Sequence, residues 1–236
     1  MRDAYGVRMS ERAELLKRVN IFIDLDEGDI LDLENSSIEK KFSKNNVIVS
    51  QEEPGSALYI LYEGRVKVVL YGDSGKELIL TVFKSGDFFG EMSLLDKKPR
   101  SAHVICMEDS KLIILERNIF EKQILKNPKV ALKILQVLSA RLRKTDESFG
   151  NLALLDVYGR LARVLIEMGN TDGKKVSEGM LIDNRPTHQE IAAMIGATRE
   201  TVSRGLSEFE RRGFITFPNT KSMIIITDSR ISDYGY

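Results

Sequence analysis

The feature that most limits the fold is the spacing of apolar residues between Ser37 and Leu115. They recur at every second position in short runs, such as 57–61, 65–70 and 78–83, and turns that contain glycine separate the runs. Side chains alternate between two faces along a β-strand, so this spacing is typical of strands with one buried face. Short strands at such regular intervals predict an antiparallel barrel or jelly roll.

Helical spacing replaces this pattern on both sides of the strand-rich region. Residues 9–35 are predicted to form one or two short amphipathic helices, and residues 117–125 another short helix. Helical spacing returns over 156–168, and the polar stretch 170–175 is predicted to be a loop. The rest of the chain is expected to hold two short helices and a hairpin, so the fold class is α+β.

A long helix is predicted from Pro128 to Leu155, because proline favours the first helical position. Residues at alternating steps of three and four form a heptad-like seam along it: Ala131, Ile134, Leu138, Arg141, Thr145, Ser148, Leu152 and Leu155. Such a seam suits pairing with an identical helix, so we expect a homodimer. The middle of the seam is polar and needs a polar partner. In the alternative interpretation, the helix packs only on its own barrel.

Composition excludes several classes of site. Cys106 is the only cysteine, so the chain cannot form an internal disulfide, a multi-thiolate zinc site or a four-cysteine iron–sulfur cluster. Strand alternation places Cys106 and His103 on opposite faces, which favours a structural role over haem or redox sensing. No nucleophile–base pair, metal cluster or phosphate-transfer loop stands out, so we do not expect an enzyme.

The chain begins without an apolar signal segment, and no apolar run approaches the length of a membrane span. We therefore expect a soluble, cytoplasmic protein with no membrane partner. Lys plus Arg equals Asp plus Glu at 35 each, and the region from Asp156 onward is also balanced. Because the bulk charge does not favour nucleic acid, a DNA-binding site must be inferred from particular residues.

A first group of such residues lies where a strand ends at Gly90. The segments are Gly90-Glu91-Met92-Ser93-Leu94 and Pro99-Arg100-Ser101-Ala102. A helical turn after Gly90 would offer backbone N–H groups to an anion, and Arg100 and Ser101 could donate to the same phosphate. Glu91 suits sugar hydroxyls, which donate to a carboxylate. The group predicts a phosphate-and-ribose site, although Glu91 and Arg100 could instead form a simple ion pair.

A second group forms a helix-turn-helix pattern. Thr187 and Glu190 fit a capping box, the helix after Thr187 ends at Gly196, and Thr198 can cap a helix over 199–211. In this second helix, helical spacing separates an apolar face (Val202, Gly205, Leu206, Phe209) from a polar face (Arg199, Glu200, Ser203, Arg204). Arginine matches guanine and glutamate can accept from cytosine, so the polar face predicts base contacts in a major groove. A solvated amphipathic helix is the alternative interpretation.

Together these motifs resemble the cyclic AMP receptor and fumarate–nitrate reductase regulator family, in its catabolite activator branch. The first group resembles the phosphate-binding cassette of cyclic-nucleotide-binding domains. The sequence 150–157 with Arg160 resembles the family's interdomain hinge, and residues 214–226 resemble its β-wing. The resemblance implies three parts: a cyclic-nucleotide-binding β-roll over 1–127, a dimerisation helix and hinge over 128–155, and a winged helix-turn-helix domain over 156–236.

The resemblance also implies the roles of individual residues. Those assigned to the cyclic nucleotide are Gly90, Glu91, Met92, Arg100, Ser101, Arg141, Thr145 and Asp146. Those assigned to DNA are Thr187, His188, Gln189, Thr198, Arg199, Glu200, Thr201, Ser203 and Arg204, of which Arg199, Glu200 and Arg204 would contact a TGTGA-like half-site. His188 stands where the enteric relative has arginine, and Asp146 where it has serine.

The implied function is a dimeric transcription regulator that binds double-stranded DNA and RNA polymerase under the control of cyclic AMP. Asp146 could accept from the adenine amino group or from guanine N1–H and N2–H, so cyclic GMP and cyclic di-GMP stay open as effectors. The motifs also allow a regulator that binds DNA without a ligand, or a nucleotide module that regulates a protein partner. A module of the second kind would leave the polar face of the second helix without a role.

Overall fold

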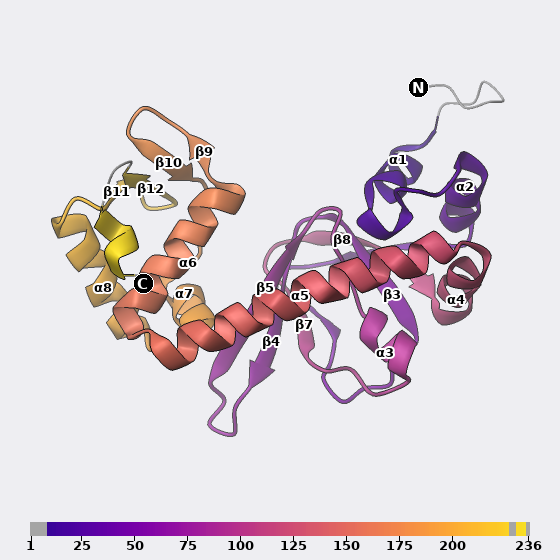
Figure 1. Ribbon diagram of the computed structural model, residues 1–236, viewed down its shortest axis with the longest axis horizontal. Helices are drawn as coiled ribbons and strands as arrows, with labels where there is room; N and C mark the ends of the chain where they lie inside the picture. The colour runs from indigo at the N-terminus through magenta and orange to yellow at the C-terminus, as the bar shows by residue number, and fades with distance from the viewer. Residues whose placement is uncertain (1–8, 227–229, 235–236) are drawn as a thin grey trace. The chain divides into compact units, whose positions relative to one another are not determined.

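The computed structural model describes residues 9–226 and 230–234, with the side chains of Arg230 and Ser232 excepted. Residues 1–8, 227–229 and 235–236, which the sequence assigns to the two terminal domains, lie outside the described residues. The chain forms two compact units, Met1–Leu70 with Leu80–Leu142, and Tyr71–Ile79 with Arg143–Tyr236. The secondary structure elements are labelled in Figure 1.

Two antiparallel four-stranded sheets form the roll that the period-two spacing predicts. One has the order β1-β8-β3-β6 and the other β2-β7-β4-β5. The strands are β1 (Ile38–Phe42), β2 (Val47–Val49), β3 (Ala57–Glu63), β4 (Arg65–Tyr71), β5 (Glu77–Lys84), β6 (Phe88–Phe89), β7 (His103–Cys106) and β8 (Ser110–Glu116). In β3, paired with β8 from Ala57↔Glu116 onward, the core-facing residues include Leu58 and Ile60, both fully buried. The predicted jelly roll is confirmed.

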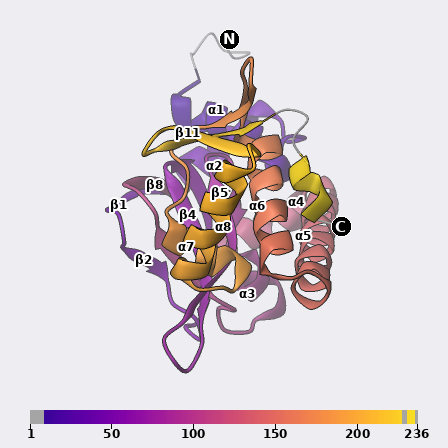
Figure 2. The same ribbon diagram turned by 90° about the vertical axis from the view of Figure 1, so that its left-hand side faces the viewer.

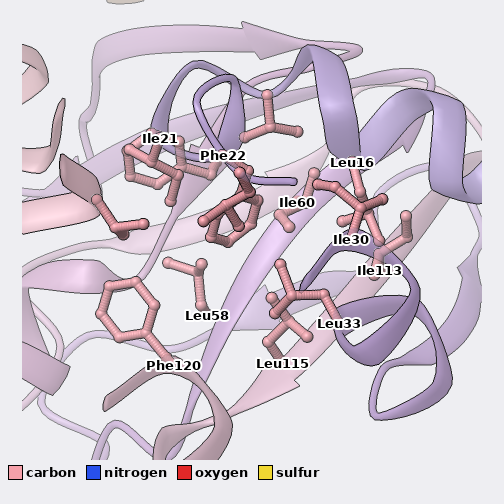
Figure 3. Close-up of a cluster of buried hydrophobic side chains, with 14 of the residues drawn as sticks. Leu16, Ile21, Phe22, Ile30, Leu33, Leu58, Ile60, Ile113, Leu115 and Phe120 are labelled. Carbon is pink, nitrogen blue, oxygen red and sulfur yellow. The ribbon is translucent and has the colours of Figure 1, made fainter. Parts of the chain in front are cut away.

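Short helices cover one side of this roll. They are α1 (Glu11–Arg18), the 3-10 turn η1 (Asn20–Phe22), α2 (Glu27–Asn35) and α4 (Arg117–Lys126). A further short helix, α3 (Glu91–Asp96), lies between β6 and β7 in the chain. Ser10 caps α1 and Asp26 caps α2 through their side chains. Figure 3 shows the shared core, in which Phe22, Phe120, Leu58 and Ile60 meet. The two N-terminal helices are therefore part of the folded unit.

The long helix α5 (Pro128–Leu154) is confirmed, but the predicted seam is wrong over its first half. Ile134 is buried and Leu138 packs against the same core as Phe22, so these residues face the chain's own roll. Arg141, at the polar middle of the predicted seam, donates to Glu91 of α3. This face of the helix is occupied within the chain, and it supplies the polar partner that the sequence required.

A different heptad is exposed on α5. Leu132, Leu135, Leu142 and Phe149 are 59–71 % exposed, and they follow one another at steps of three or seven residues. Ser139 and Asp146 complete the alternating steps of three and four and are also exposed. The exposed stripe is therefore displaced by one residue from the predicted seam at each position. We call Leu132, Leu135, Ser139, Leu142, Asp146 and Phe149 the α5 stripe.

Among the described residues, the second unit contains the end of α5, three further helices and a four-stranded sheet. The helices are α6 (Val157–Asp172), α7 (His188–Ile195) and α8 (Arg199–Arg211), which pack against one another (Figure 2). The sheet has the order β11-β12-β10-β9, with β9 (Lys174–Lys175), β10 (Gly179–Ile182), β11 (Ile215–Asn219) and β12 (Ser222–Ile226), and a 3-10 turn η2 covers Arg230–Tyr234. The loop predicted at 170–175 is wrong, because α6 continues to Asp172 and β9 follows it.

Candidate functional site

The first candidate site begins at Gly90, where β6 ends and α3 starts. Gly90 has a left-handed backbone, with φ of 88°, which a residue with a Cβ adopts only with strain. A Cβ placed there would lie 2.5 Å from Nη1 of Arg100. Glycine is therefore required both by the turn and by the side chain that packs on it.

Arg100 is held against this turn by two backbone carbonyls. Its Nη1 donates to the Gly90 oxygen at 2.7 Å, and its Nη2 donates to the Ala57 oxygen at 2.8 Å. The side chain is only 5 % exposed. Each terminal nitrogen of a guanidinium carries a second N–H, so Arg100 retains the capacity to donate to a phosphate. These bonds fix the position of the guanidinium beside the first turn of α3.

The surroundings of Arg100 strengthen its electrostatic effect. The pKa of Arg100 is lowered, because the effect of burial is larger than the opposing effect of the nearby Tyr59 and Glu91. An arginine stays protonated at neutral pH despite such a shift. Its guanidinium also lies 5.6 Å from the centre of the Tyr59 ring, within the range of a cation–π contact. A buried positive charge that is not screened by water attracts an anion more strongly than an exposed one does.

Glu91 forms its ion pair with Arg141 of α5. Nη1 of Arg141 lies 2.7 Å from Oε1 of Glu91, and Nη2 of Arg141 donates to the Phe88 oxygen at 2.6 Å. Glu91 is 2 % exposed, so the pair is shielded on the carboxylate side. The simple Glu91–Arg100 ion pair considered from sequence is thus wrong. The pairing connects the predicted ribose-binding carboxylate to the long helix.

Aromatic rings between the two arginines are a feature that the sequence analysis missed. The Tyr59 and Phe89 rings stack at 5.2 Å, and the Phe83 and Phe89 rings stack at 5.9 Å. The guanidinium of Arg141 lies 4.8 Å from the centre of the Phe83 ring. The guanidinium of Arg100 lies in a similar way 5.6 Å from the centre of the Tyr59 ring. Tyr59 and Phe83 come from strands that are distant in the sequence, so no local pattern would have identified this arrangement.

Arg117 supports the other end of the cassette and was also missed. Its Nη1 donates to the Leu94 oxygen at 2.9 Å, and its Nη2 donates to the oxygens of Gly55 and Ser93. These acceptors include carbonyl groups of α3, whose helical partners are lacking in so short a helix. Arg117 therefore fixes α3 against the loop before β3.

The remaining residues predicted to bind the nucleotide are more exposed. Met92 is 50 % exposed, and the hydroxyl of Ser101 lies 3.9 Å from its sulfur. Thr145 and Asp146 are both exposed on α5. The structure thus brings Gly90, Arg100, Met92 and Ser101 together around α3. It also brings Arg141 of α5 into an ion pair with Glu91.

The second candidate site is the pair α7 and α8, whose predicted caps are confirmed. The Thr187 side chain accepts from Glu190 N, and the Glu190 carboxylate accepts from Thr187 N at 2.7 Å, which completes a capping box. Gly196 ends α7 in the left-handed region with φ of 67°. Thr198 caps α8 by accepting from Thr201 N at 3.2 Å. Gln189, in the first turn of α7, is exposed.

The two faces of α8 are also confirmed. Val202, Gly205, Leu206 and Phe209 are buried against the domain core. Arg199, Glu200 and Arg204 are exposed, and Ser203 is partly exposed beside them. Hydrogen bonds from its own backbone N–H and from the Thr198 hydroxyl lower the pKa of Glu200. The outer face therefore presents the Glu200 carboxylate near two arginines, Arg199 and Arg204.

Arg185, in the loop before α7, and His188, the first residue of α7, lie near this face. Burial lowers the pKa of His188, and the charges of Arg185 and Arg199 lower it further. Arg185, which the sequence analysis did not single out, lies over the Phe217 ring of β11 at 4.9 Å. Its backbone N–H donates to the Lys221 oxygen at 2.8 Å, so it connects the start of α7 to the β11–β12 turn.

Other kinds of site are not found among the described residues. Within 9–226 and 230–234, no group of three or more His, Cys, Asp or Glu side chains is arranged to hold a metal ion. Over the same residues, no helix has both the length and the apolar character needed to cross a lipid bilayer. Cys106 is buried, and burial raises the pKa of its thiol.

Comparison with known families agrees with both sites. Residues 39–127 match the cyclic nucleotide-binding domain family, and residues 159–230 match the Crp-like helix-turn-helix domain family. The first match contains α3 and Arg100, and the second contains α7, α8 and the wing. The fold and the sites thus define a cyclic-nucleotide-responsive transcription regulator, and not an enzyme.

Individual relatives cover most of the chain. A CRP-like cAMP-activated global transcriptional regulator of Mycobacterium tuberculosis is 30 % identical over 93 % of this chain and 97 % of the relative. The cAMP-activated global transcriptional regulator CRP of Salmonella typhimurium is 33 % identical over 75 % of this chain and 84 % of the relative. The chain belongs to the cyclic AMP receptor and fumarate–nitrate reductase regulator (CRP/FNR) family.

Solved structures show the same fold. The c-di-GMP-responsive global regulator CLP of Xanthomonas campestris has a TM-score of 0.74 at 24 % identity, covering 85 % of this chain and 99 % of that one. A CRP/FNR-family regulator of Thermus thermophilus, TTHA1359, has a TM-score of 0.68 at 24 % identity, covering 84 % and 98 %. The order of roll, long helix and helix-turn-helix is therefore the family's fold.

Proposed function

We propose that the protein is a homodimeric regulator of transcription in the cytoplasm, which binds cyclic AMP in the roll and an inverted TGTGA-like repeat through α8. The observation that carries the proposal is the cassette around α3. There a buried guanidinium and a carboxylate lie at the start of the same short helix. Arg100 suits the cyclic phosphate, and Glu91 suits the ribose hydroxyl.

Several features support cyclic AMP as the effector. Two relatives that are 30 % and 33 % identical are described as cAMP-activated. Ser101, next to Arg100, offers a hydroxyl donor to the phosphate. Met92, half exposed beside it, offers apolar surface to the ligand.

Cyclic GMP or cyclic di-GMP is the alternative effector, because Asp146 is compatible with a guanine base as well as with adenine. A carboxylate at this position can accept from guanine N1–H and N2–H as well as from an adenine amino group. Calorimetric titration with each nucleotide decides between them. We expect cyclic AMP to bind most tightly, and Asp146→Ser to change the ratio of affinities. Tighter binding of a guanine nucleotide would replace cyclic AMP as the effector.

DNA recognition is assigned to the exposed face of α8. Arg199 and Arg204 match guanine N7 and O6, and Glu200 can accept from cytosine N4. The phosphate contacts are assigned to Thr187, His188, Gln189, Thr198 and Thr201, which lie at the starts of the two helices. Because a dimer has two-fold symmetry, the two half-sites would be centred about 34 Å apart.

The α5 stripe supports the dimer. Four large apolar side chains are exposed along one face of a helix, whereas the face with Ile134 is occupied by the roll. A heptad of this kind buries its apolar positions against a second copy. RNA polymerase is the proposed partner of the DNA-bound dimer.

A gel-shift titration tests the assignment of α8. Arg199→Ala should weaken binding to the inverted repeat by about 1–3 kcal/mol and relax discrimination at one base pair. Thr216→Ala, an exposed change in β11, is the control and should leave the affinity unaltered. Unchanged affinity of Arg199→Ala would remove α8 as the recognition helix. Binding that is identical with and without nucleotide would favour a ligand-independent regulator.

A further inference from the structure

The proposed DNA site contains one side chain whose charge changes near neutral pH. His188 is the first residue of α7, directly after the capping residue Thr187, and it is partly buried. A histidine gains or loses its charge close to neutrality, whereas an arginine stays charged. The groups around His188 therefore decide whether it contributes a positive charge to the site.

The groups near His188 are positively charged. The N-terminus of α7 itself carries partial positive charge on its backbone N–H groups. The guanidinium groups of Arg185, in the preceding loop, and of Arg199, the first residue of α8, also act on the imidazole. Each of these favours the neutral form of His188, because a further positive charge beside them is repelled.

Contacts with the wing hold Arg185 in this position. Its guanidinium lies 4.9 Å from the centre of the Phe217 ring, and its backbone N–H donates to the Lys221 oxygen at 2.8 Å. Lys221 adds another positive charge to the turn between β11 and β12. Arg185 is thus fixed through both its backbone and its side chain.

The carboxylates in the first turns of α7 and α8 already accept other hydrogen bonds. Glu190 accepts from the backbone N–H and the hydroxyl of Thr187 at 2.7 and 2.9 Å. Glu200 accepts from its own backbone N–H and from the Thr198 hydroxyl. Burial, and then the two arginines, lower the pKa of His188. In the free protein the imidazole is therefore mostly neutral at neutral pH.

A DNA phosphate would reverse this preference. A neutral imidazole donates through one ring nitrogen, whereas an imidazolium donates through both and carries a full positive charge. A negative charge within about 4–6 Å favours the charged form of a histidine. The helix N-terminus and the arginines attract the same phosphate, which in turn offsets their repulsion of the imidazolium.

We infer that His188 takes up a proton from solvent when the protein binds DNA, and that it contacts the DNA backbone as an imidazolium. DNA affinity then rises as the pH falls, because less free energy is needed to charge the side chain. The inference rests on the proposed function, since it requires that the start of α7 lies against the DNA backbone. It adds a control of that site by pH, which acts separately from the nucleotide.

The test is the pH dependence of DNA affinity. Binding of the full-length chain to a labelled inverted TGTGA repeat is measured by fluorescence anisotropy at about pH 7.5 and about pH 5.5, at fixed salt and with saturating cyclic AMP. If DNA raises the pKa of His188 by about half a unit in each of two subunits, binding should be at least about fivefold tighter at the lower pH.

Variants of the two histidines isolate this effect. His188→Gln cannot gain a charge and His188→Arg carries one at both pH values, so each should lose most of the pH dependence. His103→Gln is the matched control, because His103 is the other of the chain's two histidines and lies on β7 of the roll. It should keep the wild-type ratio of affinities. The same ratio in His188→Gln as in the wild type would show that the inference is wrong.

An unrelated duplex of the same length separates this inference from the proposed function. Phosphate contacts do not depend on base sequence, so the effect of His188→Gln on the pH dependence should appear with both duplexes. Equal affinities for the two duplexes would remove the TGTGA assignment and leave this effect in place.

A titration of the imidazole by NMR gives a second readout. The midpoint for His188 should lie below about 6.5 in the free protein and rise when DNA binds. A midpoint at or above this value in the free protein, or one that does not rise with DNA, would overturn the inference even if the repeat is bound specifically.

Discussion

At Gly90, a backbone torsion and a buried guanidinium constrain the same residue. Gly90→Ala should destabilise the roll by about 1–3 kcal/mol through its positive φ alone. It should also displace Arg100, because the added Cβ would lie 2.5 Å from Nη1. We therefore expect a loss of stability together with weakened binding of cyclic AMP, measured by urea unfolding and calorimetry.

Gly86→Ala is the matched control for this change. Gly86 has a similar φ of 91°, but its Cβ would meet no atom within 4 Å. It should lose comparable stability and keep its affinity for the nucleotide. Equal nucleotide affinities for the two variants would contradict the role given to Arg100.

Cys106 gives a second prediction at the level of a single residue. It is fully buried in the roll, and burial raises the pKa of its thiol, so less thiolate is present at neutral pH than for an exposed cysteine. Alkylation by iodoacetamide, followed by mass spectrometry, should be much slower in the native protein than in urea. Rapid alkylation of the native protein would contradict a purely structural role and favour a redox sensor.

Among the elements, α5 carries the proposed dimer contact. Leu142→Lys places a charge in the middle of the α5 stripe, where Leu142 is 62 % exposed in the single chain. Removing two such leucines from an interface costs about 3 kcal/mol or more, which corresponds to about a 100-fold weaker dimer. Sedimentation velocity at micromolar concentration should show the dissociation.

Leu125→Lys provides the control for the α5 stripe. Leu125 is 83 % exposed, but it lies on α4 and outside the α5 stripe. This variant should sediment as the wild type does. Dissociation of both variants, or of neither, would contradict the assignment of the interface to the α5 stripe.

The elements also show what local sequence determines. The caps of α7 and α8 can be predicted from sequence because each depends on residues within one turn, such as Thr187 with Glu190. The position of the α5 seam cannot be predicted from sequence, because the neighbouring row of residues along the helix has the same alternating spacing of three and four residues. Its orientation is decided by contacts with the roll, including that of Arg141 with Glu91, which is distant in the sequence. The same is true of Tyr59 and Arg117 in the nucleotide site.

In the whole molecule, the proposed nucleotide site and the proposed DNA site are linked through a single equilibrium. A ligand that stabilises the DNA-binding arrangement must bind more tightly when DNA is present, by the factor by which it tightens DNA binding. Typical couplings of about 1–3 kcal/mol correspond to factors of about 5–150. Calorimetric titration of cyclic AMP into the protein, alone and bound to DNA, should give a factor in this range.

The most direct measurement of the central claim is the affinity for an inverted TGTGA repeat at fixed salt, by fluorescence anisotropy, with and without saturating cyclic AMP. The account predicts that cyclic AMP lowers the dissociation constant at least about fivefold, and that Arg100→Ala removes this effect. The same dissociation constant in both conditions, although calorimetry shows the nucleotide bound, would contradict it.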